Sequence, residues 1–132
     1  MNNEDKKIIN NTKKILVVED DLSLLSALKD KLTREGFSIF VAKNGIEGLE
    51  LVLNNKPDLI MLDLLMPKMD GITMLKNVRE YEWGEKVPVI ILSNLSNEKL
   101  VAQTLEIGAY DYLIKSDWKI EDIIAKIKEK LV

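Results

Sequence analysis

The sequence predicts an α/β protein in which one doubly wound parallel sheet is covered by helices on both faces. Short runs of aliphatic and β-branched residues alternate along the chain with segments whose apolar residues recur at the period of a helix. The run Leu59–Leu62, in the middle of the series, is wholly apolar, which is typical of a strand buried on both faces. Five such repeats in 132 residues predict one domain with one core.

Five segments are expected to be strands, because each is a short run enriched in Val, Ile, Leu, Phe or Tyr. They are separated by helical segments, so neighbouring strands are expected to be parallel and joined by right-handed crossovers. In chain order the expected strands are Lys14–Val18, Ser38–Ala42, Leu59–Leu62, Val89–Leu92 and Tyr112–Ile114.

Five helices are expected between and after these strands. The first has leucines at positions 22, 25, 28 and 32 on one stripe and ends at Gly36, which favours the left-handed conformation of a helix end. The second covers Gly45–Asn54 and the third begins near Gly71. The fourth covers about Asn97–Ile107 and stops at Gly108. The apolar face of the last helix is formed by Ile120, Ile123, Ile124, Ile127 and Leu131.

The composition excludes several classes of function. Hydrophobic residues make up 46% of the chain, but no apolar stretch approaches the ~20 residues that span a bilayer, so no membrane contact is expected. The net charge of −3 is small and no block of Lys and Arg is present, so direct nucleic-acid binding is not expected. Cysteine and histidine are absent, which excludes thiol chemistry and a phosphohistidine on the chain itself.

The start of the chain is polar. Residues 1–12 are expected to be a flexible N-terminal leader, and residues 13–132 the folded domain. Because this start lacks the apolar centre of a secretory signal, the expected location is the cytoplasm. The last amphipathic helix runs to the end of the sequence, so a single-domain protein is expected.

Three acidic residues stand where apolar runs end. Glu19 and Asp20 follow Ile15–Val18, and Asp63 follows Leu59–Leu62. In a parallel α/β sheet, ligands bind in the crevice beyond the carboxyl ends of the strands, so these carboxylates are expected to face one pocket. Neighbouring anions repel one another unless a cation lies among them, and oxygen ligands suit Mg²⁺. The sequence therefore predicts a magnesium site.

Each polar residue also has a simpler explanation when taken alone. Asp20 or Asp21 can be the N-cap of the helix that follows. Ser93, after the fourth strand, can also be a helix cap, Lys115, after the fifth, can be a solvated surface residue, and Tyr112 can be part of the core. Acids, a hydroxyl and an ammonium at the ends of four strands are chemically complementary, however, and together they favour a functional site.

Four segments contain these residues: ILVVEDD, PDLIMLDLLMPKMDG, VPVIILSNLS and GAYDYLIK. Because of these four segments, the chain resembles the receiver domain of bacterial response regulators. The resemblance covers about Lys13 to Val132. An Asp followed by an apolar pair, Met-Pro and then Asp-Gly is the most specific pattern. The resemblance implies the flavodoxin-like strand order 2-1-3-4-5, which puts the first and third strands side by side and so brings the acids together.

The resemblance implies a role for each acid. Asp63 is expected to be the phosphoacceptor and a metal ligand, and Asp20 is expected to bind Mg²⁺ directly. Glu19 stands where receivers more often have Asp, and its longer side chain is expected to reach the metal through water. The backbone carbonyl of Leu65 is expected to complete the protein's share of the ligands.

The resemblance also implies roles for the residues after the fourth and fifth strands. Ser93 is expected to hydrogen-bond one phosphoryl oxygen and Lys115 to neutralise another, while Ser93 and Tyr112 form a switch pair. These types of residue suit the chemistry, because phosphoryl transfer spreads charge over oxygens and needs in-line positioning together with positive charge.

Several positions depart from the family pattern. Lys115 is followed by Ser116, where receivers usually have a proline after a cis peptide bond, so the sequence leaves open whether this bond is cis or trans. Asn94 is bulkier than the small residue often found there and could crowd the phosphoryl group. Leu65 and Leu95 stand where polar groups often orient a hydrolytic water, which predicts a long-lived phosphorylated form.

The function expected from this resemblance is a phosphoacceptor switch of a two-component system, similar to single-domain chemotaxis regulators. The donor is expected to be a histidine kinase or histidine phosphotransfer protein, since the chain has no histidine. No enzymatic activity is expected beyond Mg²⁺-dependent self-phosphorylation on Asp63 and slow self-dephosphorylation. Output is expected through contact of a downstream protein with the fourth helix, fifth strand and fifth helix; homodimerisation stays open. Candidate exposed positions on this face are Lys99, Gln103, Glu106, Lys119 and Lys126.

Three alternatives belong to other classes. A receiver-like binding module that works without phosphorylation is kept open by the Lys115–Ser116 departure. A Mg²⁺-dependent phosphatase with Asp63 as nucleophile commonly needs a second acid two residues later, where this chain has Leu65. A flavin-binding protein needs a hydroxyl-rich phosphate loop after the first strand, where the acids would repel the phosphate.

Overall fold

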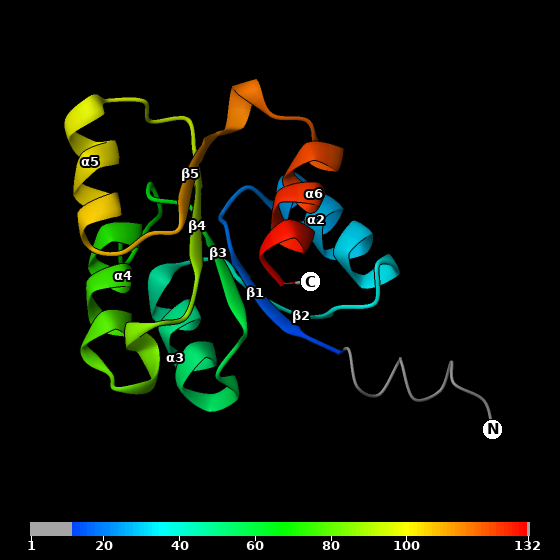
Figure 1. Ribbon diagram of the computed structural model, residues 1–132, viewed down its shortest axis with the longest axis horizontal. Helices are drawn as coiled ribbons and strands as arrows, with labels where there is room; N and C mark the ends of the chain where they lie inside the picture. The colour runs from blue at the N-terminus through cyan, green and yellow to red at the C-terminus, as the bar shows by residue number, and fades with distance from the viewer. Residues whose placement is uncertain (1–11, 132) are drawn as a thin grey trace.

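The computed structural model describes residues 12–131, which form a parallel sheet, five α-helices and two short 3₁₀ helices (Figure 1). Of the expected leader, residues 1–11 lie outside the described part of the chain. In chain order the elements are β1 (Lys14–Val18), α2 (Leu22–Arg34), β2 (Ser38–Ala42), α3 (Gly45–Asn55), β3 (Leu59–Leu62), α4 (Gly71–Glu80), η1 (Trp83–Glu85), β4 (Val89–Ser93), α5 (Glu98–Glu106), β5 (Asp111–Ile114), η2 (Lys115–Asp117) and α6 (Ile120–Leu131).

The sheet has the expected topology. Its strands are all parallel and lie in the order β2-β1-β3-β4-β5. Val18 at the end of β1 pairs with Ala42 of β2 on one side and Leu62 of β3 on the other. The carboxyl ends of β1 and β3 therefore lie side by side, and the predicted doubly wound fold is confirmed.

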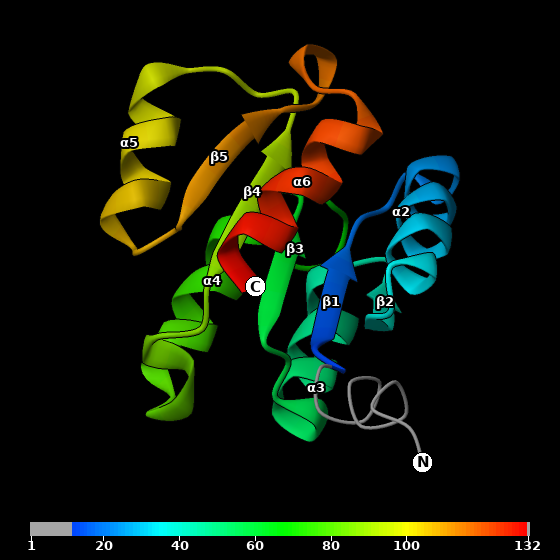
Figure 2. The same cartoon turned by 45° about the vertical axis from the view of Figure 1, so that its right-hand side comes forward.

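The helices cover both faces of the sheet, as Figures 1 and 2 show. Alternate residues of β3 belong to two separate hydrophobic clusters: Ile60 and Leu62 to the cluster on the α3, α4 and α5 side, and Leu59 and Met61 to the cluster with α2 and α6. Because both faces of β3 are buried, the strand needs apolar residues at every position. This is why its sequence is a continuous apolar run.

Polar residues and glycines determine where helices begin and end. Asp21, Asn44 and Asp70 accept backbone hydrogen bonds as the N-caps of α2, α3 and α4. Gly36 and Gly108 follow α2 and α5 with φ of +99° and +96°, a conformation that favours glycine. Both glycines thus end helices as the sequence predicted.

Small differences from expectation occur at element ends. β4 includes Ser93, β5 begins at Asp111, and α3 extends to Asn55. The short helices η1 and η2 were not expected, because three residues are too few to show a helical period. Among residues 12–131, no helix is long and apolar enough to cross a membrane.

Candidate functional site

The three predicted acids meet at the carboxyl ends of β1 and β3. The amide of Asp63 donates to the Val18 carbonyl at 3.0 Å, and the amide of Glu19 donates to the Ala42 carbonyl at 2.9 Å, so both backbones are tied to neighbouring strands. One carboxylate oxygen from each of Glu19, Asp20 and Asp63 lies within 4.8 Å of the others. Glu19 and Asp63 are 2% and 5% exposed, whereas Asp20 faces solvent.

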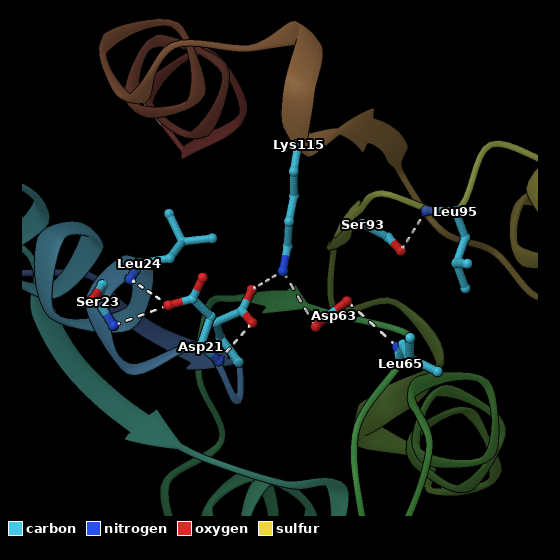
Figure 3. Close-up of polar contacts among 9 residues, drawn as sticks. Asp21, Ser23, Leu24, Asp63, Leu65, Ser93, Leu95 and Lys115 are labelled. Atoms are coloured by element: carbon cyan, nitrogen blue, oxygen red, sulfur yellow. Dashed lines mark hydrogen bonds and ion pairs between the residues drawn. The ribbon is translucent and has the colours of Figure 1, made fainter.

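The helix-cap explanation applies to the third acid of the EDD sequence, not to the second. Asp21 Oδ1 accepts hydrogen bonds from the amides of Ser23 and Leu24, as Figure 3 shows. Asp20 is not part of this cap and lines the pocket beside Asp63. Its carboxylate therefore remains available to a cation.

Lys115 lies between two of the acids. It extends from η2 toward them (Figure 3), with Nζ 2.7 Å from Glu19 Oε1 and 3.3 Å from Asp63 Oδ2. Burial alone would lower the pKa of Lys115, but the hydrogen bond to Glu19 and the negative charges of Asp63 and Glu19 outweigh it and raise the pKa. No cis peptide bond occurs in residues 12–131, so the Lys115–Ser116 bond is trans, and Lys115 still reaches the acids.

Glu19 is the most deeply buried acid of the cluster. Burial raises its pKa to about 7, and the charge of Asp63 adds to the rise. Hydrogen bonds from Lys115 and from the Asp21 amide, the latter at 3.0 Å, act in the opposite direction. The Glu19 carboxylate is thus costly to ionise until more positive charge arrives.

Ser93 and Tyr112 both contact the backbone of one loop residue. Ser93, the buried last residue of β4, accepts a hydrogen bond at Oγ from the Leu95 amide at 3.1 Å. The Tyr112 hydroxyl donates to the Leu95 carbonyl. Burial raises the pKa of Tyr112, which favours this protonated, donating form. Leu95 therefore connects the two predicted switch residues.

A pocket of about 240 Å³ opens above Asp63. Asp20 and Lys115 line it with the predicted hydroxyl residue Ser93, and Asn94 lies at its edge. The remaining lining residues are apolar and exposed: Leu65 is 69% exposed and Leu95 is 36% exposed. A larger hollow of about 340 Å³ lies between α2 and α6, where its lining residues include none of the clustered acids.

The cluster fits a hard divalent cation. Its donors are carboxylate oxygens from three residues, and two of these are buried against each other with a single ammonium as counter-charge. The Leu65 amide donates to Asp63 Oδ1 at 3.4 Å, which places the Leu65 backbone beside the Asp63 carboxylate. Oxygen ligands of this number and charge suit Mg²⁺, with water completing the shell.

The comparisons with known proteins decide the family. The sequence pattern of the response regulator receiver domain matches residues 15–128. The chain belongs to the response regulator receiver family. Receiver domains are signalling modules of two-component systems rather than classical enzymes, they use Mg²⁺ at an acidic pocket, and they interact with histidine kinases and downstream targets.

Relatives and solved structures agree on this receiver domain. The response regulator MprA of Mycobacterium sp. (strain KMS) is 33% identical over 118 residues, covering 89% of the chain and 50% of MprA. The receiver domain of Francisella response regulator 1452 has a TM-score of 0.80 at 35% identity, covering 89% of this chain and 94% of that one. The Borrelia burgdorferi CheX–CheY–BeF₃–Mg complex gives 0.82 at 32% identity, covering 91% and 90%. The chain spans about half the length of the curated MprA relatives that it matches.

Two sets of contacts, one at the site and one away from it, had no signal in the sequence. The Ser93 and Tyr112 side chains contact only backbone atoms of Leu95, so any residue type could occupy position 95. Arg79, at the end of α4, donates to four backbone carbonyls and resembles an ordinary arginine at a helix C-terminus until the tertiary structure is known.

Proposed function

We propose that residues 13–132 form a receiver that accepts a phosphoryl group on Asp63 from the phosphohistidine of a histidine kinase or histidine phosphotransfer protein. One observation supports this most strongly: carboxylate oxygens of Glu19, Asp20 and Asp63 lie within 4.8 Å of one another, with Lys115 Nζ 3.3 Å from Asp63. Carboxylates that can hold a cation, an anionic nucleophile and an ammonium in one pocket are what phosphoryl transfer requires.

The transfer forms one bond and breaks another. A carboxylate oxygen of Asp63 attacks phosphorus, the bond from phosphorus to the donor's imidazole nitrogen breaks, and the imidazole leaves with the electron pair. Lys115 is placed to neutralise one phosphoryl oxygen, and the Ser93 hydroxyl to donate to another. Asp63 is largely buried, and its carboxylate lines the pocket through which the donor would approach.

Mg²⁺, when bound, neutralises charge on the phosphoryl oxygens and on the acids. Asp20 would hold it directly from the pocket wall, with Asp63 and the Leu65 carbonyl beside it. Glu19 lies beneath the pocket and would act through water, consistent with its 2% exposure.

Phosphorylation would change the loop that Ser93 and Tyr112 hold. The Ser93 oxygen accepts from the Leu95 amide and has its own proton to donate to a phosphoryl oxygen, but drawing the side chain toward Asp63 in this way would weaken its contact with the Leu95 amide. Release of this loop biases a two-state equilibrium of the loop and Tyr112. The altered face is formed by α5, β5 and α6, where we place the downstream protein contact and any homodimer contact.

The lifetime of the phosphorylated form is part of the proposal. Leu65 and Leu95 line the pocket and carry no group that could orient a water for attack on the acyl phosphate. Self-phosphorylation from small donors and slow self-dephosphorylation are therefore the only catalysis we assign. The proposed location is the cytoplasm, where histidine kinases present their phosphohistidine.

The alternative of a binding module independent of phosphorylation depended on the path of Lys115. With a trans bond before Ser116, Nζ still lies 3.3 Å from Asp63 Oδ2, which favours the phosphorylated switch. A phosphatase remains disfavoured, because the residue two positions after Asp63 is the exposed Leu65.

Incubation with acetyl phosphate and Mg²⁺, followed by intact mass measurement, tests the function. Wild type should gain one phosphoryl group and Asp63→Asn none. Asp30→Asn is the matched control, since Asp30 is an exposed acid paired with Arg34 on α2, and it should be modified like wild type. Absence of an adduct in wild type, or an adduct in Asp63→Asn, would contradict the assignment.

A further inference from the structure

Helix α5 is packed more weakly than the other α-helices of the described chain. Of its 9 residues, Thr104 is the buried one, whereas α2, α3, α4 and α6 each have at least three buried residues. Leu100 and Ile107 add partly buried contacts with the core. So little buried surface leaves the position of α5 dependent on its polar contacts.

The C-terminal end of α5 has a strong polar anchor. The guanidinium of Arg79, in the last turn of α4, donates to the Ile107 carbonyl at 3.2 Å and to the Gly108 carbonyl at 2.9 Å. The same group donates to the carbonyls of Gly84 and Val87, both at 2.7 Å. One side chain thus joins the end of α5 to the α4–β4 connection, and Figures 1 and 2 show this end of α5 next to α4.

The anchor is specific to arginine. Its partners are carbonyl oxygens on two separate chain segments, and among residues 12–131 no carboxylate pairs with Arg79. The planar guanidinium spreads five N–H donors over three nitrogens and so reaches all four carbonyls, whereas lysine has three donors on one nitrogen and cannot reproduce this set. Gly108 fits closely against it, since a Cβ there would lie 3.2 Å from Arg79 Nε.

Among residues 12–131, no side chain anchors the N-terminal end of α5 in a comparable way. Its cap, Asn97, accepts hydrogen bonds from the amides of Lys99 and Leu100 within the same helix. The residues between Ser93 and this cap are exposed, and their described ties to the sheet run through the contacts of Leu95 with Ser93 and Tyr112. These are the contacts that phosphorylation would alter.

We propose that Arg79 is the hinge of the switch: it fixes the C-terminal end of α5, so that a change at Ser93 swings the N-terminal end of the helix. Arg79 is a positioning residue that touches neither the acids nor the pocket. The trigger rests on the proposed phosphorylation of Asp63, whereas the fixed end of α5 exists without it.

The first test uses the unphosphorylated protein. Amide hydrogen exchange should be slower at residues 105–109 than at residues 99–103 in wild type. Arg79→Lys should speed exchange at residues 105–109 by about tenfold, because hydrogen bonds from a charged donor are lost. Arg34→Lys, a change at an exposed arginine of α2, should leave the exchange rate at residues 105–109 unchanged. Equal exchange along α5 in wild type, or no effect of Arg79→Lys, overturns the proposal.

The second test adds Mg²⁺ and beryllofluoride, which forms an acyl-phosphate analogue on a carboxylate. In wild type, amide chemical-shift changes within the loop and α5 should be largest at residues 94–103 and small at 105–109. In Arg79→Lys these chemical-shift changes should extend to residues 105–109. The mass added to this variant by acetyl phosphate should equal that added to wild type. Changes already spread over the whole of α5 in wild type would overturn the hinge. If wild type formed no adduct with acetyl phosphate, the phosphoacceptor assignment would be overturned, but the hydrogen-exchange result on the fixed end of α5 would still hold.

Discussion

The metal half of the site (Glu19, Asp20 and Asp63) and the switch half (Ser93, Leu95 and Tyr112) rest on differently packed parts of the molecule. The metal half follows β1 and β3 and is continued by α2 and α4, which bury three and four residues. Ser93 and Tyr112 of the switch half lie in β4 and β5, and the loop that contains Leu95 leads into α5, in which Thr104 is the buried residue. On the proposed function, a phosphoryl group bound between the two halves would contact the firmly packed metal half on one side and the loosely packed switch half on the other. The metal half would then hold the group in place, while the switch half could change conformation.

The largest change in unfolding free energy is expected from Lys115→Met, which removes the ammonium between the two halves. Glu19 and Asp63 would then be buried without their counter-charge, so the metal-free protein should lose about 2–3 kcal/mol of unfolding free energy. Mg²⁺ should restore part of the loss. Urea denaturation with and without Mg²⁺ measures both effects.

Lys128→Met is the matched control, because it breaks an exposed ion pair with Glu35 and should cost less than about 1 kcal/mol. Equal losses in the two variants would mean that the metal half does not depend on Lys115.

The next effect is the pH dependence of the metal-free protein. Folding raises the pKa of Glu19 from 4.5 to about 7, so the folded state binds more protons between these values. The unfolding free energy should fall as pH rises, by on the order of 2 kcal/mol between pH 5.5 and 7, and level off above the folded-state pKa. Denaturation between pH 5.5 and 8 measures the slope. Glu19→Gln, which cannot ionise, should flatten it; an unchanged slope in this variant would assign the effect to another group.

A third prediction concerns the apolar rim of the pocket. Leu65→Asn places a polar group two residues after Asp63, where it can orient water, so loss of the phosphoryl group should accelerate by about tenfold, or roughly 1.4 kcal/mol in the barrier. Mass measurements over time after removal of acetyl phosphate follow the decay. Leu53→Asn, at an exposed leucine of α3, should not change it. Decay of wild type within seconds would contradict a long-lived form.

The smallest effect is expected from Tyr112→Phe, which changes only the switch half. It deletes the hydrogen bond to the Leu95 carbonyl, worth about 1 kcal/mol. Exchange at residues 95–97 should quicken several-fold, while Mg²⁺ affinity and the Asp63 adduct stay unchanged. Tyr110→Phe, at an exposed tyrosine beside Lys130, is the control. Weaker Mg²⁺ binding in Tyr112→Phe would show that the two halves are not separable.

Sequence reasoning worked where burial alone determines the residue type. The bounds of β1, β2 and β3 match the expected runs. Almost every residue of β1 and β3 is buried and must be apolar, whereas the half-buried edge strand β2 is recognised by its β-branched and aromatic residues. The meeting of Glu19, Asp20 and Asp63 followed once β1 and β3 were neighbours. The order of the strands came from the family resemblance.

The remainder depended on backbone geometry. Sequence could not decide between Asp20 and Asp21 as the cap of α2, since either carboxylate suits that role. The route of Lys115 through η2, the contacts of Leu95 and the four carbonyls around Arg79 all involve main-chain atoms. Such contacts leave no trace in residue types, except for the positive φ that requires glycine at Gly108.

Titration of Mg²⁺ into ¹⁵N-labelled protein tests the central claim most directly. Amide shifts should move and saturate at residues 19–21 and 63–65, and Asp20→Asn should weaken the binding while leaving the folded spectrum intact. A spectrum that Mg²⁺ leaves unchanged at these residues would contradict the assignment of the acids as a metal site and the phosphoryl chemistry that depends on it.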